Sequence, residues 1–158
     1  MNIIVNIADM KISKNPEDTL TTYALGSCMG MTAYDPDSMV GGMLHAMLPM
    51  SRADLQKASV NPFMFVDSGI SRLLNDLISF GANKKSIIIK IAGCSNMMDD
   101  NNFFKIGERN YTITRKILWK NDFLITSEEI GGKASRTLSL DMSTGKTYIM
   151  NKRDKNEL

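Results

Sequence analysis

Short apolar segments separated by turn residues fill the first third of the chain and predict β-strands. Runs of this length, bounded by Pro, Asp and Asn, are typical of strands rather than helices. The turn signals are Asn-Pro-Glu-Asp at 15–18 and Asp-Pro-Asp at 35–37. We expect strands over residues 3–7, 20–25, 30–34 and 40–48, the last closed by Pro49.

A different period follows and predicts the best-defined helix, over residues 62–80. Apolar side chains recur there at the three- and four-residue spacing that places them on one face. Asn61 can cap this helix, Pro62 suits its first turn, and Gly81 can end it. The apolar face comprises Val66, Ile70, Leu73, Leu74, Leu77 and Ile78.

The remainder of the chain mixes both patterns. We expect a buried strand over residues 86–92, then a helix over 108–120 whose threonines weaken the helical pattern. A strand over 123–127 and a glycine turn at 131–132 follow, and the strands 136–141 and 146–150 form a hairpin. Because strands are adjacent at both ends of the chain, we expect mixed β-sheets with packed helices, an α+β fold rather than a doubly wound one. No linker or repeat divides residues 1–158, which predicts a single domain with a mobile tail from about residue 151.

Composition narrows the classes of function. The 158 residues, 43% hydrophobic and 23% charged, are enough for a core without disulfides. The formal net charge of +2 comes from 19 basic and 17 acidic residues spread along the chain, so no nucleic-acid-binding surface is indicated. No apolar run approaches the roughly 20 residues of a spanning helix, and no signal-peptide pattern appears. We therefore expect a cytoplasmic protein that is not inserted in a membrane.

The cysteine and histidine content argues against a metal site. Cys28 and Cys94 lie far apart without CxxC spacing, and His45 is the only histidine. We expect no metal and no other cofactor. A disulfide between the two cysteines is possible in principle, but a chain without a secretion signal usually keeps its thiols reduced.

Cys28 and His45 are the candidate reactive pair. An apolar strand leads into the turn Gly26-Ser27 that presents Cys28, and Gly26 allows backbone conformations that other residues resist. A thiol with its usual pKa of about 8.5 needs a base at neutral pH. His45 lies 17 residues after Cys28, in the expected strand over 40–48. This separation fits two neighbouring strands joined through the turn at 35–37. The alternative is a buried small residue and a satisfied core histidine, and the residue types alone leave both interpretations open.

Several sequence blocks, in this order, resemble the CheD family of chemoreceptor glutamine deamidases. The most specific are Thr22-x-x-Leu25-Gly26-Ser27-Cys28, Tyr34-Asp35-Pro36 and Gly41-Gly42-x-x-His45-x-x-Leu48-Pro49. Supporting blocks are Ile106-Gly107-Glu108-Arg109-Asn110, Ile130-Gly131-Gly132, Arg136 and Ser143-Thr144-Gly145-Lys146. The chain departs from the family pattern at Gly93-Cys94-Ser95, where such sequences tend to have Gly-Gly-Ala, and the resemblance makes Cys94 structural.

The resemblance implies a catalytic triad of Cys28, His45 and Thr22, and a fold similar to the catalytic domains of glutamine-deamidating toxins. It implies that the substrates are glutamines on the cytoplasmic helices of methyl-accepting receptors, and that the CheC phosphatase is a partner. The backbone at Gly26, Ser27 and Cys28 is the expected oxyanion or substrate contact. Without a heptad pattern we expect a monomer. Two alternatives stay open, a mainly regulatory partner of CheC and a cysteine hydrolase of another protein substrate.

Overall fold

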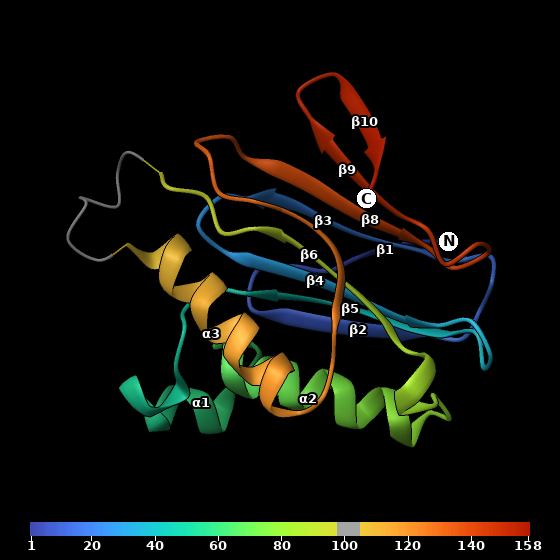
Figure 1. The fold of residues 1–158 in the computed structure, drawn as a ribbon, viewed down its shortest axis with the longest axis horizontal. Helices are drawn as coiled ribbons and strands as arrows, with labels where there is room; N and C mark the ends of the chain where they lie inside the picture. Colours follow the sequence, from blue (N-terminus) through green and yellow to red (C-terminus); the bar gives the residue numbers. More distant parts are fainter. Residues whose placement is uncertain (98–104) are drawn as a thin grey trace.

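A computed structural model describes residues 1–97 and 105–158, which form two five-stranded sheets and a layer of helices. We call the sheet of order β1-β3-β8-β9-β10 the outer sheet and the sheet of order β2-β5-β4-β6-β7 the central sheet. Figure 1 shows the central sheet between the outer sheet on one side and the helices on the other. This arrangement confirms the predicted α+β class with mixed sheets.

The outer sheet joins the start of the chain to its end. β1 pairs in parallel with β3, and every other neighbouring pair is antiparallel. Its strands are β1 (Asn2–Ile4), β3 (Thr19–Leu25), β8 (Arg136–Asp141), β9 (Thr147–Asn151) and β10 (Asp154–Glu157). The predicted hairpin of β8 and β9 is confirmed.

The central sheet is antiparallel except for the pairing of β6 with β7. Its strands are β2 (Asp9–Ser13), β4 (Met29–Asp35), β5 (Val40–Ala46), β6 (Ile88–Gly93) and β7 (Ile125–Ile130). Every residue of β4 and β5 is buried, because one face meets the outer sheet and the other meets the helices. The predicted pairing of the strand after Cys28 with the strand that contains His45 is confirmed.

Within residues 1–97 and 105–158, three α-helices lie on the free face of the central sheet, and three short 3₁₀ helices occur before or between them and the strands. The α-helices are α1 (Leu55–Val60), α2 (Val66–Ser79) and α3 (Ile106–Lys120), and the 3₁₀ helices are η1 (Ser51–Ala53), η2 (Pro62–Met64) and η3 (Lys84–Ser86). α2 buries the apolar face that the sequence predicts, apart from Ile78, which is 43% exposed. Gly81, with a φ of +109°, follows the end of α2 in a conformation that favours glycine.

The structure differs from the sequence prediction in several boundaries. The expected helix over 62–80 is interrupted at Phe65, which is extended, fully buried and bridged to Leu48. The expected strand over 3–7 is shorter, and the separate strand β2 and the helix α1 were not predicted. β7 begins at Ile125 because Phe123 packs into the helical core instead. The tail expected to be mobile from about residue 151 is exposed but pairs with β9 as β10.

Candidate active site

Cys28 and His45 project from the same face of the central sheet. In the register of β4 and β5, Gly30 lies opposite His45, and opposite residues of a pair point to one side. Cys28 precedes Gly30 by two residues and packs against the core between the two sheets, which is the side that His45 faces. Diagonal neighbours of this kind have Cα atoms roughly 7–8 Å apart, within reach of side chains that lean toward each other. The fold therefore brings the two predicted groups to one location.

Gly30 leaves no room for another side chain beside His45. A Cβ atom at position 30 would lie 2.7 Å from Cδ1 of Leu25 and 3.0 Å from Cδ2 of Leu138. Both leucines come from the outer sheet, so the two sheets approach closely at this point. This close approach lets a side chain of the outer sheet reach the His45 ring.

Thr22 on β3 makes that contact and defines the tautomer of His45. The Thr22 hydroxyl donates to the main-chain carbonyl of Val5 (2.6 Å), which can only accept. Its oxygen also lies 2.7 Å from Nδ1 of His45. Because the single hydroxyl hydrogen is already committed to Val5, Nδ1 must carry the hydrogen of this second bond. Nε2 then has the lone pair, as a general base requires.

A bulge in β3 places Thr22 and the turn that follows it. The register of β3 against β8 shifts between Thr22 and Leu25. Ala24 within this bulge has a φ of +58°, in the left-handed region. The left-handed conformation near the turn is thus adopted by Ala24 and not by Gly26, where it was expected. A Cβ atom at Gly26 would lie 3.4 Å from the side chain of Met97.

Burial sets the charge state of His45. The side chain has no exposed surface, and desolvation lowers its pKa from 6.5 to about 4. Among the described residues, Nε2 has no hydrogen-bond acceptor or donor within range. His45 is therefore neutral at physiological pH, and its basic nitrogen is buried.

Three consecutive carbonyls hold the turn that carries the thiol. The Gly26 carbonyl accepts from the Ser95 amide (2.9 Å), and the Cys28 carbonyl accepts from the Cys94 amide (2.8 Å). The Ser27 carbonyl accepts from the Asn110 side chain (2.9 Å). These partners come from the segment after β6 and from α3, and no role for Ser95 or Asn110 was predicted from the sequence. Their only signal was position within or beside the family blocks.

Arg136 fixes the segment that supports this turn. Its buried guanidinium donates to the carbonyls of Gly93 (3.2 Å) and Gly131 (2.8 Å) and to the Ser95 hydroxyl (2.9 Å). It also forms an ion pair with Glu129 (2.8 Å). Arg136 belongs to β8 of the outer sheet, so it joins the two sheets beside the turn.

Beyond Met29 and Ala46, the last pair of the β4–β5 ladder, the two strands separate. The next pair in register would be Cys28 with Met47. The Met47 amide instead donates to the carbonyl of Met64 (2.9 Å). We call this separation, with Cys28 on one branch and Met47 on the other, the strand fork.

Cys94 has the opposite environment to Cys28. It is 3% exposed, and its pKa is raised to about 12, chiefly by desolvation and further by the proximity of Cys28. Both cysteines are thiols, so the disulfide considered from the sequence is not formed. The burial of Cys94 agrees with its interpretation as a structural residue.

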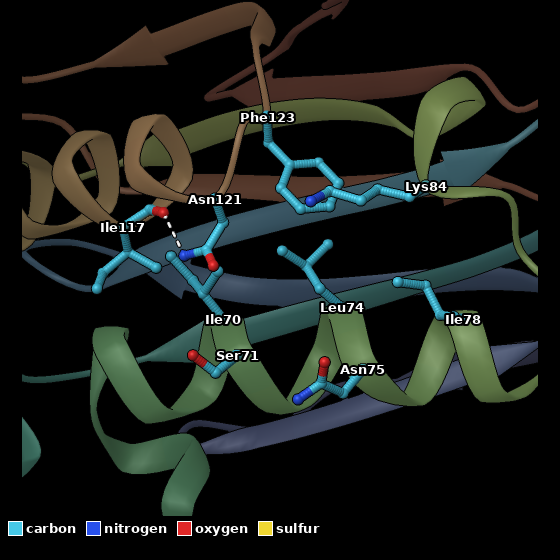
Figure 2. A pocket seen from close by; sticks show the side chains of 9 residues that line it. All are labelled: Ile70, Ser71, Leu74, Asn75, Ile78, Lys84, Ile117, Asn121 and Phe123. Atoms are coloured by element: carbon cyan, nitrogen blue, oxygen red, sulfur yellow. Dashed lines mark hydrogen bonds between the residues drawn. The ribbon is translucent and has the colours of Figure 1, made fainter.

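Other features of the described residues lie apart from this site. Residues 1–97 and 105–158 contain no group of three or more His, Cys, Asp or Glu side chains arranged to hold a metal ion. None of the helices in the described part of the chain is both long and apolar enough to span a membrane. A cavity of about 150 Å³ lies between α2 and α3, and Figure 2 shows the side chains that line it. Its lining offers no thiol or imidazole and consists of Ile70, Ser71, Leu74, Asn75, Ile78, Lys84, Ile117, Asn121 and Phe123.

Cysteine-dependent acyl-transfer enzymes combine a thiol with an imidazole that a third group orients. Residues of these three types, Cys28, His45 and Thr22, meet where the two sheets approach. The family model described as CheD chemotactic sensory transduction matches residues 47–151, and the chain belongs to the CheD family. This confirms the resemblance of the sequence blocks. The matched span begins after His45, so it does not include Thr22, Cys28 or His45.

Curated relatives extend the match over nearly the whole chain. A protein of Syntrophus aciditrophicus (strain SB), named "Probable chemoreceptor glutamine deamidase CheD 1", is 47% identical over 148 residues, 94% of this chain and 92% of the relative. A protein of Solibacter usitatus (strain Ellin6076), named "Probable chemoreceptor glutamine deamidase CheD", is 44% identical over 156 residues, 99% of this chain and 92% of the relative. The crystal structure of Neisseria meningitidis protein NMB0706 (family-model DUF152) has a TM-score of 0.44 at 8% identity, covering 82% of this chain and 62% of that one.

Proposed function

We propose that this protein hydrolyses the side-chain amide of glutamine on chemoreceptors to glutamate, with Cys28 as nucleophile and His45 as base. The observation that carries the proposal is the contact of Thr22 with Nδ1 of His45, which leaves Nε2 basic on the sheet face shared with Cys28. The names of the CheD relatives supply the substrate class. The names alone would give no residue roles, and the geometry alone would give no substrate.

In the first step the Cys28 sulfur attacks the side-chain carbonyl carbon of glutamine. The pKa of His45, about 4, keeps its imidazole neutral at physiological pH, so Nε2 is able to accept a proton. Nε2 therefore takes the thiol proton as the carbon–sulfur bond forms. It then gives that proton to the amide nitrogen, the carbon–nitrogen bond breaks, and ammonia leaves a thioester.

In the second step water hydrolyses the thioester. Nε2 takes a proton from the water, whose oxygen bonds to the carbonyl carbon, and the carbon–sulfur bond breaks. The sulfur regains a proton and glutamate is released. Thr22 holds the imidazole in one tautomer throughout, but as a neutral group it stabilises the imidazolium less than a carboxylate would, so turnover is modest.

The backbone amides of Ser27 and Cys28 are the proposed oxyanion donors. The carbonyls of Gly26 and Ser27 are held by Ser95 and Asn110. In a trans peptide the N–H points opposite to the C=O of the same plane, so the amides of Ser27 and Cys28 point away from those partners. Two fixed amides of adjacent residues can stabilise the negative oxygen that forms during attack.

The test is incubation with a receptor cytoplasmic domain, followed by peptide mass mapping. The wild-type protein should convert particular glutamines to glutamate, a gain of about 1 Da each, with equal release of ammonia. Cys28→Ala should leave the receptor unmodified while keeping a wild-type melting temperature, because removal of the nucleophile stops both steps. Full deamidation by Cys28→Ala would refute the proposed mechanism.

The same assay separates the alternatives. Peptide cleavage in place of the mass change would indicate a protease. Stimulation of the CheC phosphatase, the partner that the family resemblance implies, needs no thiol, so Cys28→Ala should retain it if this regulatory role exists. We further propose that the protein acts as a monomer in the cytoplasm, where the receptor helices lie.

A further inference from the structure

The side chain of Asn110 on α3 spans the strand fork. Its Nδ2 atom lies 2.9 Å from the carbonyl oxygen of Ser27 and 3.0 Å from that of Met47. Ser27 precedes the thiol on one branch, and Met47 follows His45 by two residues on the other. Both neighbours are carbonyl oxygens, so the amide nitrogen, which alone can donate, must face them. One side chain thus replaces the ladder bonds that are absent where the strands separate.

Asn110 is buried, and two main-chain carbonyls accept hydrogen bonds from its amide. The side chain has no exposed surface, and its Oδ1 atom has no hydrogen-bond partner among residues 1–97 and 105–158. An apolar side chain of similar size would avoid the unpartnered acceptor but would take the donor away from the carbonyls of Ser27 and Met47. The two donated bonds are what the amide provides at this position.

We propose that Asn110 is a positioning residue, whose two N–H groups fix the branch that carries Cys28 relative to the Met47 branch and so relative to His45, which lies in the paired ladder just before the fork. This inference rests on the proposed cysteine chemistry. Without the bridge the Cys28 branch can move relative to His45, and a misplacement of about 1 Å can lower turnover about 100-fold. Groups that bind the receptor away from the thiol are unaffected, so KM should change little.

Two variants and a matched control test the inference with a receptor fragment. Asn110→Ala removes the bridge, and Asn110→Asp keeps its shape but has no N–H to donate at neutral pH. Thr114→Val is the control, because Thr114 is buried one turn further along α3 and its hydroxyl donates to the main-chain carbonyl of Asn110 (2.8 Å). We expect kcat to fall about 10- to 100-fold in both Asn110 variants with KM within about twofold, and Thr114→Val to keep the wild-type kcat.

The alkylation rate of Cys28 by iodoacetamide is a second readout that needs no receptor. Near pH 7 both Asn110 variants should react about 10-fold more slowly than wild type, and the rates should converge above the usual thiol pKa of about 8.5, where thiolate forms without the imidazole. Buried Cys94 should stay unmodified, whereas unfolding would expose both thiols.

Wild-type kcat and alkylation profiles in both Asn110 variants would overturn the inference. A fall in kcat accompanied by alkylation of Cys94 would also overturn it, because the residue would then act through stability. If wild-type protein fails to deamidate the receptor but the alkylation profiles shift as expected, the proposed substrate is wrong and the role of Asn110 stands.

Discussion

The two thiols of this protein lie close together in the fold and have opposite surroundings. Cys94 is buried behind the turn, and desolvation raises its pKa to about 12. Cys28 is partly exposed and shares a sheet face with His45, whose lone pair at Nε2 can take a proton. The backbone of Cys94 supports Cys28 through the bond from its amide to the Cys28 carbonyl. In the proposed mechanism a thiol therefore needs both a basic nitrogen and solvent access, and proximity to the site is not enough.

The largest change should follow from removal of the base. His45→Gln keeps a polar side chain of similar size but has no group that accepts a proton at neutral pH. We expect turnover of a receptor fragment to fall about 10²- to 10⁴-fold, the usual contribution of a general base. Ammonia release under single-turnover conditions measures it, and turnover within a factor of two of wild type would remove His45 from the mechanism.

Loss of the Thr22 hydroxyl should have a smaller effect. Thr22→Val leaves Nδ1 of His45 without its acceptor, and we expect turnover to fall about 10- to 100-fold, as for other lost orienting bonds. Thr22→Ser keeps the hydroxyl and is the matched control, with near wild-type turnover. Since His45 is the only histidine, ¹⁵N-histidine NMR reports its tautomer in a single set of signals. A proton on Nε2 in the wild-type protein would contradict the assignment.

The buried imidazole should also make stability depend on pH. The pKa of His45 is 6.5 when unfolded and about 4 in the fold, so the unfolded chain binds a proton first as the pH falls. The stabilisation is complete above pH 6.5 and is lost between 6.5 and about 4; the loss should reach about 3 kcal/mol. Urea unfolding across this range measures it. In His45→Gln the slope should be much smaller, and an equal slope would assign it to other groups.

The smallest effect on activity should come from the other thiol. Cys94→Ala removes one buried sulfur atom and should lower the free energy of unfolding by about 1 kcal/mol, with turnover unchanged. The control is Cys28→Ala, which should keep the free energy of unfolding of the wild type and lose turnover. Inactivity of a folded Cys94→Ala variant would exchange the roles of the two cysteines.

Local sequence signals predicted the part of the site that depends on one hairpin. The turn at 35–37 joins β4 to β5, which brings the strands of Cys28 and His45 together as expected. Thr22 lies in the other sheet, and its assignment came from the family resemblance, because no periodicity indicates which outer strand crosses His45.

Long-range contacts account for what the sequence did not predict. Asn110 reaches Ser27 across 83 positions of the chain and Arg136 reaches Gly93 across 43, and such pairings depend on the packing of whole elements. The interruption of the predicted helix at Phe65 has the same origin, since a bridge to Leu48 overrides the local helical pattern. The short strand β2 was missed because its alternation of polar and apolar residues covers only Asp9–Ser13, five positions.

The most direct test of the central claim is the site and consequence of limited alkylation. Folded wild-type protein would be treated with iodoacetamide near pH 7, and modified peptides and residual deamidation would be measured on the same samples. Cys28 should be modified while Cys94 is not, and deamidation should fall in proportion to the fraction of Cys28 that is modified. Modification of Cys94 before Cys28, or full activity after complete alkylation of Cys28, would contradict it.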